Sequence, residues 1–194
     1  MFVKLKNMKK CLPLFISGVL LGLISCRINC PDFDKKILNW IPYQEKDIIE
    51  LYSQSKDSTI IFSIKDVVID HTTHYHGKCA CGDYISIRGH DKSNFQIFIS
   101  SEGDFIQSQS YQIGDTNFND NDTYTEINDF LFESIKYDIV RIFEKNNSKE
   151  TFKKLIIAKD IGIIGLIDIY GNTWILKTNT TIKRPNITIN KTSC

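Results

Sequence analysis

Apolar and polar residues alternate along much of the chain with the two-residue period of a β-strand. Before residue 115 the strand-like segments are Asp47–Ser53, Thr59–Asp70, Asp83–Arg88, Asn94–Ser101 and Phe105–Gly114. They are rich in β-branched and aromatic residues, and turn-forming stretches such as Gln54–Ser58 and Gly89-His90-Asp91 separate them. This pattern predicts an antiparallel meander.

The last third of the chain continues the pattern, with one ambiguous segment. Residues 152–176 contain two strand-like runs and the turn signal Gly171-Asn172 before a short strand, Thr173–Leu176. Residues 115–122 are expected to form a loop, on composition. Residues 127–143 fit a helical stripe, but the alternation from Tyr137 to Phe143 also fits a strand, which we favour. The expected fold is mainly β, an antiparallel meander of about eight to ten strands forming an open barrel or sandwich, with at most one helix.

The start of the chain has the three parts of a secretory signal. A basic stretch with four lysines precedes an apolar run from Leu12 to Ile24, and the small residue Ser25 stands before Cys26. The apolar run is shorter than the roughly 20 residues that a helix needs to span a hydrocarbon core. We therefore expect a processed signal rather than a permanent membrane span.

The end of this signal, Leu23-Ile24-Ser25-Cys26, resembles the lipobox of bacterial lipoproteins. The resemblance implies a thioether-linked diacylglycerol on Cys26, cleavage after Ser25 and acylation of the new amino terminus. A thiol suits thioether formation, and several acyl chains hold a protein at a membrane where a single chain binds only marginally. Arg27 replaces the aspartate associated with inner-membrane retention, which favours the outer membrane. The alternatives are secretion with an unmodified Cys26 and an uncleaved anchor.

These features divide the chain into a signal peptide (1–25), a tether (26–39), a β-rich domain (40–177) and a polar C-terminal tail (178–194). Trp40-Ile41-Pro42-Tyr43 is expected to be the first packed element. Removing the signal leaves 20 basic and 23 acidic residues, so the formal net charge changes from +1 to about −3. Nucleic acid is therefore not expected as a partner, because such partners require a broad basic surface.

The end of the β-rich domain resembles the closing hairpins of small β-rich lipoproteins from Bacteroidetes-type bacteria. The resemblance rests on Tyr137-Asp138-Ile139-Val140, on the run from Ile157 to Ile164, on the hairpin that carries Trp174, and on the lipobox. In those proteins a glycine usually stands at the position of Asp160. They are largely uncharacterised, so the resemblance implies a lipid-anchored β-rich domain without naming an activity.

Four cysteines remain once Cys11 leaves with the signal and Cys26 is acylated: Cys30, Cys79, Cys81 and Cys194. In an oxidising compartment they allow three disulfide pairings. In an extended strand the Cα atoms of Cys79 and Cys81 would lie roughly 6.5–7 Å apart, at the outer limit of a disulfide. Bridges from this pair to Cys30 and Cys194 are geometrically easier, and they would tie both ends of the mature chain to its middle.

Three of the four histidines and two of the cysteines fall within residues 71–81. Imidazole and thiolate are the ligands that Zn²⁺ and Cu(I) prefer, so His74, His76, Cys79 and Cys81 form a candidate metal site. Their spacing matches no well-attested zinc finger or knuckle, and our first expectation is that the protein has no cofactor. The alternatives to a metal site are disulfide-bonded cysteines beside solvated histidines, and free thiols in a loop.

The sequence lacks the motifs of several enzyme classes, namely G-x-S-x-G, H-E-x-x-H, a P-loop, and G-x-G-x-x-G after a strand. It therefore predicts a non-enzymatic cell-envelope lipoprotein, whose β-rich domain binds an unknown protein or small molecule or has a structural role. A metal-binding envelope protein is the second hypothesis, and an exported enzyme is the third. A cavity enclosed by the meander would favour a ligand, whereas a filled core would favour a scaffold.

Overall fold

The computed structural model describes residues 35–70, 73–75, 78–80, 82–90, 94–102, 105–119, 121–146 and 149–177. In these ranges the chain forms a short 3₁₀-helix, η1 (Lys35–Asn39), followed by β-strands. The strands are β1 (Ile48–Ser53), β2 (Ser58–Asp70), β3 (Thr73–Tyr75), β4 (Lys78–Ala80), β5 (Asp83–Gly89), β6 (Phe95–Glu102), β7 (Phe105–Ile113), β8 (Thr116–Asn119), β9 (Thr123–Phe132), β10 (Ile135–Glu144), β11 (Phe152–Ala158), β12 (Gly162–Asp168) and β13 (Thr173–Leu176). The fold is mainly β, as the alternation predicts.

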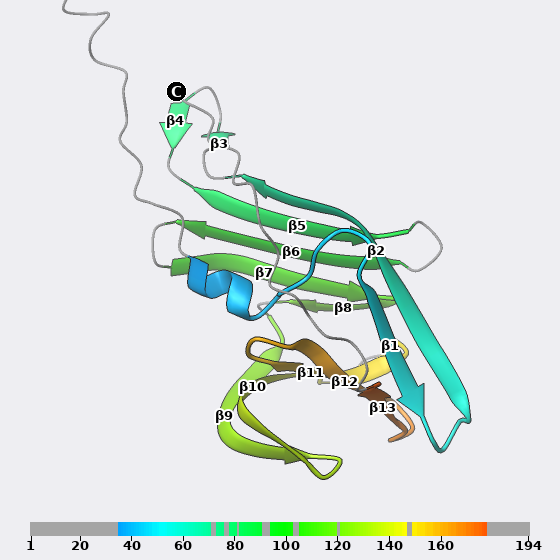
Figure 1. The fold of residues 1–194 in the computed structure, drawn as a ribbon. Helices are drawn as coiled ribbons and strands as arrows, with labels where there is room; N and C mark the ends of the chain where they lie inside the picture. Colours follow the sequence, from blue (N-terminus) through cyan, green and yellow to red (C-terminus); the bar gives the residue numbers. More distant parts are fainter. Residues whose placement is uncertain are drawn as a thin grey trace, which may run out of the picture.

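Eleven of these strands form one antiparallel sheet that curves into a half-barrel (Figure 1). The strand order is β8-β7-β6-β5-β2-β1-β13-β12-β11-β10-β9, and β3 and β4 form a separate two-stranded ribbon between β2 and β5. The sheet consists of two meanders, joined where β1 pairs with β13 and Leu51 lies opposite Leu176. As a result β8 and β9, which follow one another in the chain, are the two opposite edges of the sheet.

Both meanders contribute side chains to one large apolar core. Its members include Leu51 of β1, Ile97 of β6, Tyr111 of β7 and Leu155 of β11, all of them fully buried. Between the two meanders lies η1 (Figure 1), and Trp40, Ile41 and Tyr43 after it are buried in this same core. We expected Trp40-Ile41-Pro42-Tyr43 to be the first packed element, after a tether that ends at residue 39. Packing begins earlier, because Ile37 of η1 is buried in the same core. The interior between the meanders is thus filled by side chains.

A second, smaller core lies on the other face of β11 and β12. Because successive strand residues point to opposite faces, Leu155 enters the first core and Ile156 enters the second. The β9–β10 hairpin covers the second core with Phe132, whose ring lies so close to Gly165 that a Cβ atom there would be 2.6 Å from two ring carbons. Strands β11 and β12 are therefore buried on both faces.

The N-terminal segment is fixed to the turn between β11 and β12. The Asp160 amide donates to the Asn39 carbonyl, and the Ile163 amide donates to the Tyr43 hydroxyl at 2.5 Å. Burial raises the pKa of Tyr43 well above its usual value, so its phenol stays protonated. Asp160 has a φ of +64°, in the left-handed region that aspartate tolerates better than most residues with a Cβ atom.

Residues 115–122 and 127–143 are the two segments whose predicted structure was wrong in part or ambiguous. Residues 127–143 lie in strands β9 and β10, as we favoured, and the helical alternative is wrong. A tight turn at Glu133 and Ser134, with φ values of +49° and +66°, separates these strands. The expected loop at 115–122 is wrong in part, because β8 (Thr116–Asn119) lies within it and pairs with β7.

Candidate functional site

The residues singled out in the sequence fall mostly outside the described ranges. Cys26, Cys30, His76, Cys81 and Cys194 all lie outside them, as does the predicted tail at 178–194. His74 and Cys79 lie in β3 and β4, where the backbone register places them directly opposite one another. Their side chains are not among those described, so neither the metal site nor the disulfide pairing is tested. Within the described ranges, no group of three or more His, Cys, Asp or Glu side chains could hold a metal ion.

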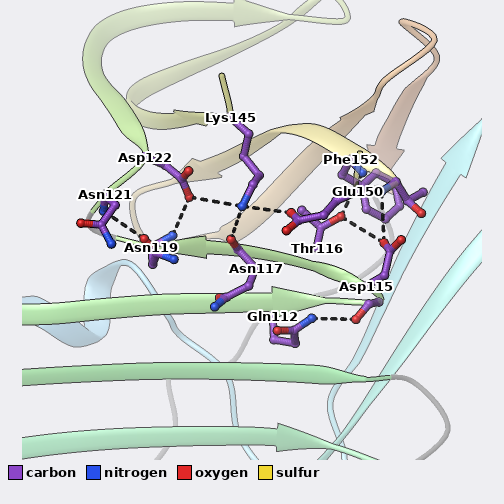
Figure 2. Close-up of polar contacts among 12 residues, drawn as sticks. Gln112, Asp115, Thr116, Asn117, Asn119, Asn121, Asp122, Lys145, Glu150 and Phe152 are labelled. Atoms are coloured by element: carbon purple, nitrogen blue, oxygen red, sulfur yellow. Dashed lines mark hydrogen bonds and ion pairs between the residues drawn. The ribbon is translucent and has the colours of Figure 1, made fainter. Parts of the chain in front are cut away.

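One polar cluster lies where edge strand β8 meets the β10–β11 hairpin (Figure 2). We call this cluster the polar seam; it consists of Asp115, Thr116, Asn117, Asp122, Lys145 and Glu150. The Lys145 Nζ donates to the Asn117 carbonyl at 2.6 Å and forms ion pairs with Glu150 at 2.9 Å and with Asp122 at 3.8 Å. Only 14% of the Lys145 side chain is exposed, and it is surrounded by oxygen atoms. This arrangement is typical of a structural ion pair.

The other half of the seam caps the start of β11. The buried Thr116 Oγ1 accepts a hydrogen bond from the Phe152 amide at 3.0 Å, and Asp115 Oδ1 accepts one from the Thr151 amide at 3.1 Å. Burial alone would raise the pKa of Asp115, yet the hydrogen bonds from Thr151 and Thr116 outweigh it and lower the pKa. These side chains replace the strand-to-strand bonds that β8 does not make with β11. The seam therefore holds the open side of the half-barrel together.

Replacing Thr116 with valine should destabilise the protein by about 1–3 kcal/mol, because the buried Phe152 amide loses its acceptor while the side-chain volume is kept. The matched control is Thr125→Val on an exposed position of β9, for which a change within about 0.5 kcal/mol is expected. Urea unfolding of the purified proteins measures both. Equal midpoints for the two variants would contradict a structural role for the seam.

A different surface has the features of a binding site. The β1–β2, β9–β10 and β12–β13 turns surround an open hollow of about 400 Å³. We call it the turn hollow, and its lining residues are Gln54, Ser55, Glu133, Tyr170, Gly171, Asn172, Thr173 and Ile175. It lies outside the filled core, at the ends of the hairpins, where binding residues are often found.

The β12–β13 turn is held rigidly by a buried carboxylate. Asp168 Oδ1 accepts from the Tyr170 and Asn172 amides at 2.9 and 2.8 Å, and Oδ2 accepts from the Asn172 side chain at 2.8 Å. Burial by itself would raise the pKa of Asp168, but the hydrogen bonds from Asn172 and Tyr170 more than offset it and lower the pKa. Ser55 donates to Asn172 Oδ1 at 3.0 Å, which joins this turn to the β1–β2 turn.

Several groups around the turn hollow are available for a ligand. The side chains of Gln54, Glu133 and Thr173 form no hydrogen bond or ion pair within the described ranges. Tyr170 is 81% exposed, the largest fraction among the described large apolar side chains, and Lys56 Nζ lies 5.6 Å from its ring centroid. The hollow thus presents one aromatic ring, amides, hydroxyls and a carboxylate.

Two of the three turns that surround this hollow could be predicted from the sequence. Gln54–Ser58 and Gly171-Asn172 have turn compositions, but Glu133-Ser134 has none of the glycine or asparagine usual at positive φ. That the three turns meet depends on the pairing of β1 with β13 across more than 100 residues, which no local pattern reveals.

Of the described residues, none belongs to a helix long and apolar enough to cross a membrane. Comparisons of the chain with family models, with curated proteins and with solved structures found no match.

Proposed function

We propose that this protein is a cell-envelope lipoprotein, anchored through Cys26, whose β-rich domain is a binding module at the outer membrane. The observation that carries the proposal is the Leu23-Ile24-Ser25-Cys26 motif at the end of a basic and then apolar segment. Cleavage after Ser25 would make Cys26 the first residue of the mature chain, and Cys26 would also carry the lipid. No protein partner is implied by the anchor itself.

The position of the turn hollow supports such a role. Lys35 at the start of η1 is nine positions after Cys26, so the domain would lie within about 30 Å of its anchor. The β11–β12 turn contacts the segment after η1, and the seven residues of β12 lead from there to Asp168 beside the hollow, roughly 20 Å away. In Figure 1, η1 and the β1–β2 turn likewise lie at opposite sides of the molecule. An anchor at the η1 end would leave the hollow accessible.

A Cys26→Ser variant tests the anchor. In a bacterial host that processes lipoproteins, the parent protein should fractionate with membranes, incorporate labelled palmitate and have the mass of an acylated chain that begins at Cys26. The variant should lose the label and keep residues 1–25. Cys11→Ser is the matched control, because it changes a cysteine inside the signal and should leave processing unchanged. A Cys26→Ser protein that matures and partitions like the parent would refute the proposal.

A metal-binding envelope protein is the second candidate. It is favoured by the backbone register of β3 and β4, which sets His74 directly opposite Cys79, because opposite residues in an antiparallel pair have neighbouring Cβ atoms. His76 and Cys81 would complete a ligand set for Zn or Cu. Elemental analysis of metal-loaded protein purified without a histidine tag tests this candidate. One equivalent that is lost in a His74→Ala variant would support it, whereas a metal-free parent with Cys79 and Cys81 in disulfides would exclude it.

A further inference from the structure

We infer that the turn hollow binds a neutral sugar unit of a glycan. This inference deepens the proposed function, because it names a ligand class for the β-rich domain. It does not depend on the lipid anchor, since none of the lining residues lies near Cys26 in the chain. Four observations carry it: the size of the hollow, its exposed tyrosine, its unpartnered polar groups and its rigid frame.

The size and shape of the hollow fit a small polar unit. Its volume of about 400 Å³ lies in the range of small-molecule sites. The hollow is open and formed by turn residues, so a ligand would be covered on one side and could continue into solvent. A unit within a longer glycan meets this condition, because its neighbours extend beyond the site.

The exposed aromatic ring favours a ligand with an apolar face. Tyr170 is 81% exposed, so the fold gains little of the free energy that burial of an aromatic side chain supplies. The Tyr170 backbone amide donates a hydrogen bond to Asp168 Oδ1, which holds Tyr170 in place, and Lys56 Nζ lies over the ring. The C–H groups of a sugar ring form a flat apolar patch that can pack on such a ring.

The polar groups that have no partner among the described residues favour a ligand that both donates and accepts hydrogen bonds. The Gln54 amide and the Thr173 hydroxyl can do both, while Glu133 accepts. Each sugar hydroxyl likewise donates and accepts, so it can pair with any of these groups. Glu133 is the one charged residue that lines the hollow, and Lys56 beside the Tyr170 ring has the opposite charge. The hollow therefore has no cluster of like charges that would select an anion or a cation.

A protein partner is less well supported by the same surface. Stable protein interfaces bury roughly 800 Å² on each partner and have an apolar centre. Among the residues that line the hollow, Tyr170 is the one exposed large apolar side chain, Ile175 is partly buried and most of the others are polar. Leu131 and Ile169, each within two residues of a lining residue, are also exposed. A rigid, small, mixed surface of this kind suits a sugar better than a protein face.

The test is binding of the detergent-solubilised full chain to immobilised oligosaccharides. The neutral set contains hexoses, N-acetylhexosamines and deoxyhexoses, and the acidic set contains uronic acids and sulfated sugars. The parent protein should bind at least one neutral sugar. Tyr170→Ala should weaken that binding about tenfold or more, since it removes the aromatic face. Gln54→Ala should weaken it by a smaller factor. The Cys26→Ser protein should bind as the parent does, which separates this test from that of the anchor.

Tyr124→Ala is the matched control, because Tyr124 is also exposed, at 49%, and lies on β9 away from the hollow. It should leave sugar binding unchanged. In addition, the bound sugar should protect Tyr170 from nitration, measured by mass spectrometry of its peptide. The inference would be overturned if the folded parent bound no neutral sugar or only acidic ones, or if Tyr170→Ala bound as tightly as the parent. Capture of a protein partner in place of any sugar would overturn it too.

Discussion

Replacing Gly162 with alanine should destabilise the protein by about 3–4 kcal/mol, a large part of the total stability of a typical domain. Gly162 begins β12 with a φ of +88°, a conformation that residues with a Cβ rarely adopt. A Cβ atom built at this position would lie 2.6 Å from the ring carbon Cζ of Tyr43 and would collide with its hydroxyl. The substitution therefore combines backbone strain with overpacking.

Tyr43 has little freedom to move away from such a Cβ. Its side chain is 3% exposed in the main core, and its hydroxyl accepts the hydrogen bond from the Ile163 amide. A displaced phenol would leave that buried amide without an acceptor, which adds to the cost. Since Tyr43 follows η1, the variant should also loosen the N-terminal segment, and amide exchange at Ile163 should become faster.

Gly171→Ala separates strain from collision. Gly171 has a nearly identical φ of +85°, but nothing lies within 4 Å of a Cβ atom built there. This control should cost only the backbone strain, about 1–2 kcal/mol. Urea unfolding of both variants gives the comparison. If Gly162→Ala were no more destabilised than Gly171→Ala, the packing of Tyr43 against this turn would not be as described.

Strands β5 and β6 could be predicted because one of their faces is packed and the other is exposed. In β5 the buried residues Ile85 and Ile87 alternate with residues that are partly exposed. Strands β11 and β12 have no such alternation, because apolar clusters cover both of their faces. Their nearly continuous apolar runs predict a strand in a buried layer, although they do not indicate which residue enters which core.

The parts that could not be predicted depend on contacts between distant residues. Strand β8 is polar in composition, and it forms because Tyr111 of β7 lies opposite Phe118 while side chains of the seam cap its edge. The β9–β10 turn at Glu133 and Ser134 has no glycine, so the local sequence is compatible with a helix as well as with two strands. The contact between Phe132 and the distant Gly165 belongs to the strand arrangement, and no local pattern predicts it. The turn hollow depends on the same hairpin, and therefore the candidate site could not be found from local sequence.

Phe143→Ala should destabilise the protein by about 3–5 kcal/mol, because it truncates one of the largest fully buried side chains of the core. Phe143 of β10 is fully buried, and its ring lies 5.1 Å from that of Tyr111 on β7 and 5.5 Å from that of Tyr124 on β9, between centroids. Tyr111 and Phe143 belong to the two different meanders, which have no backbone pairing near this point. Removing the Phe143 ring therefore removes a packing contact between the two meanders.

Phe98→Ala provides the matched control on the other side of the sheet. Phe98 is half-buried and stacks with Tyr84 at 6.1 Å within a single meander, so its loss should cost about 1 kcal/mol. The two variants should also differ in where the structure loosens. Phe143→Ala should speed amide exchange in both β7 and β10, whereas Phe98→Ala should affect β5 and β6 alone. If Phe143→Ala changed exchange only in β10, the two meanders would not be coupled through this ring, and the closure of the half-barrel would depend on the polar seam instead.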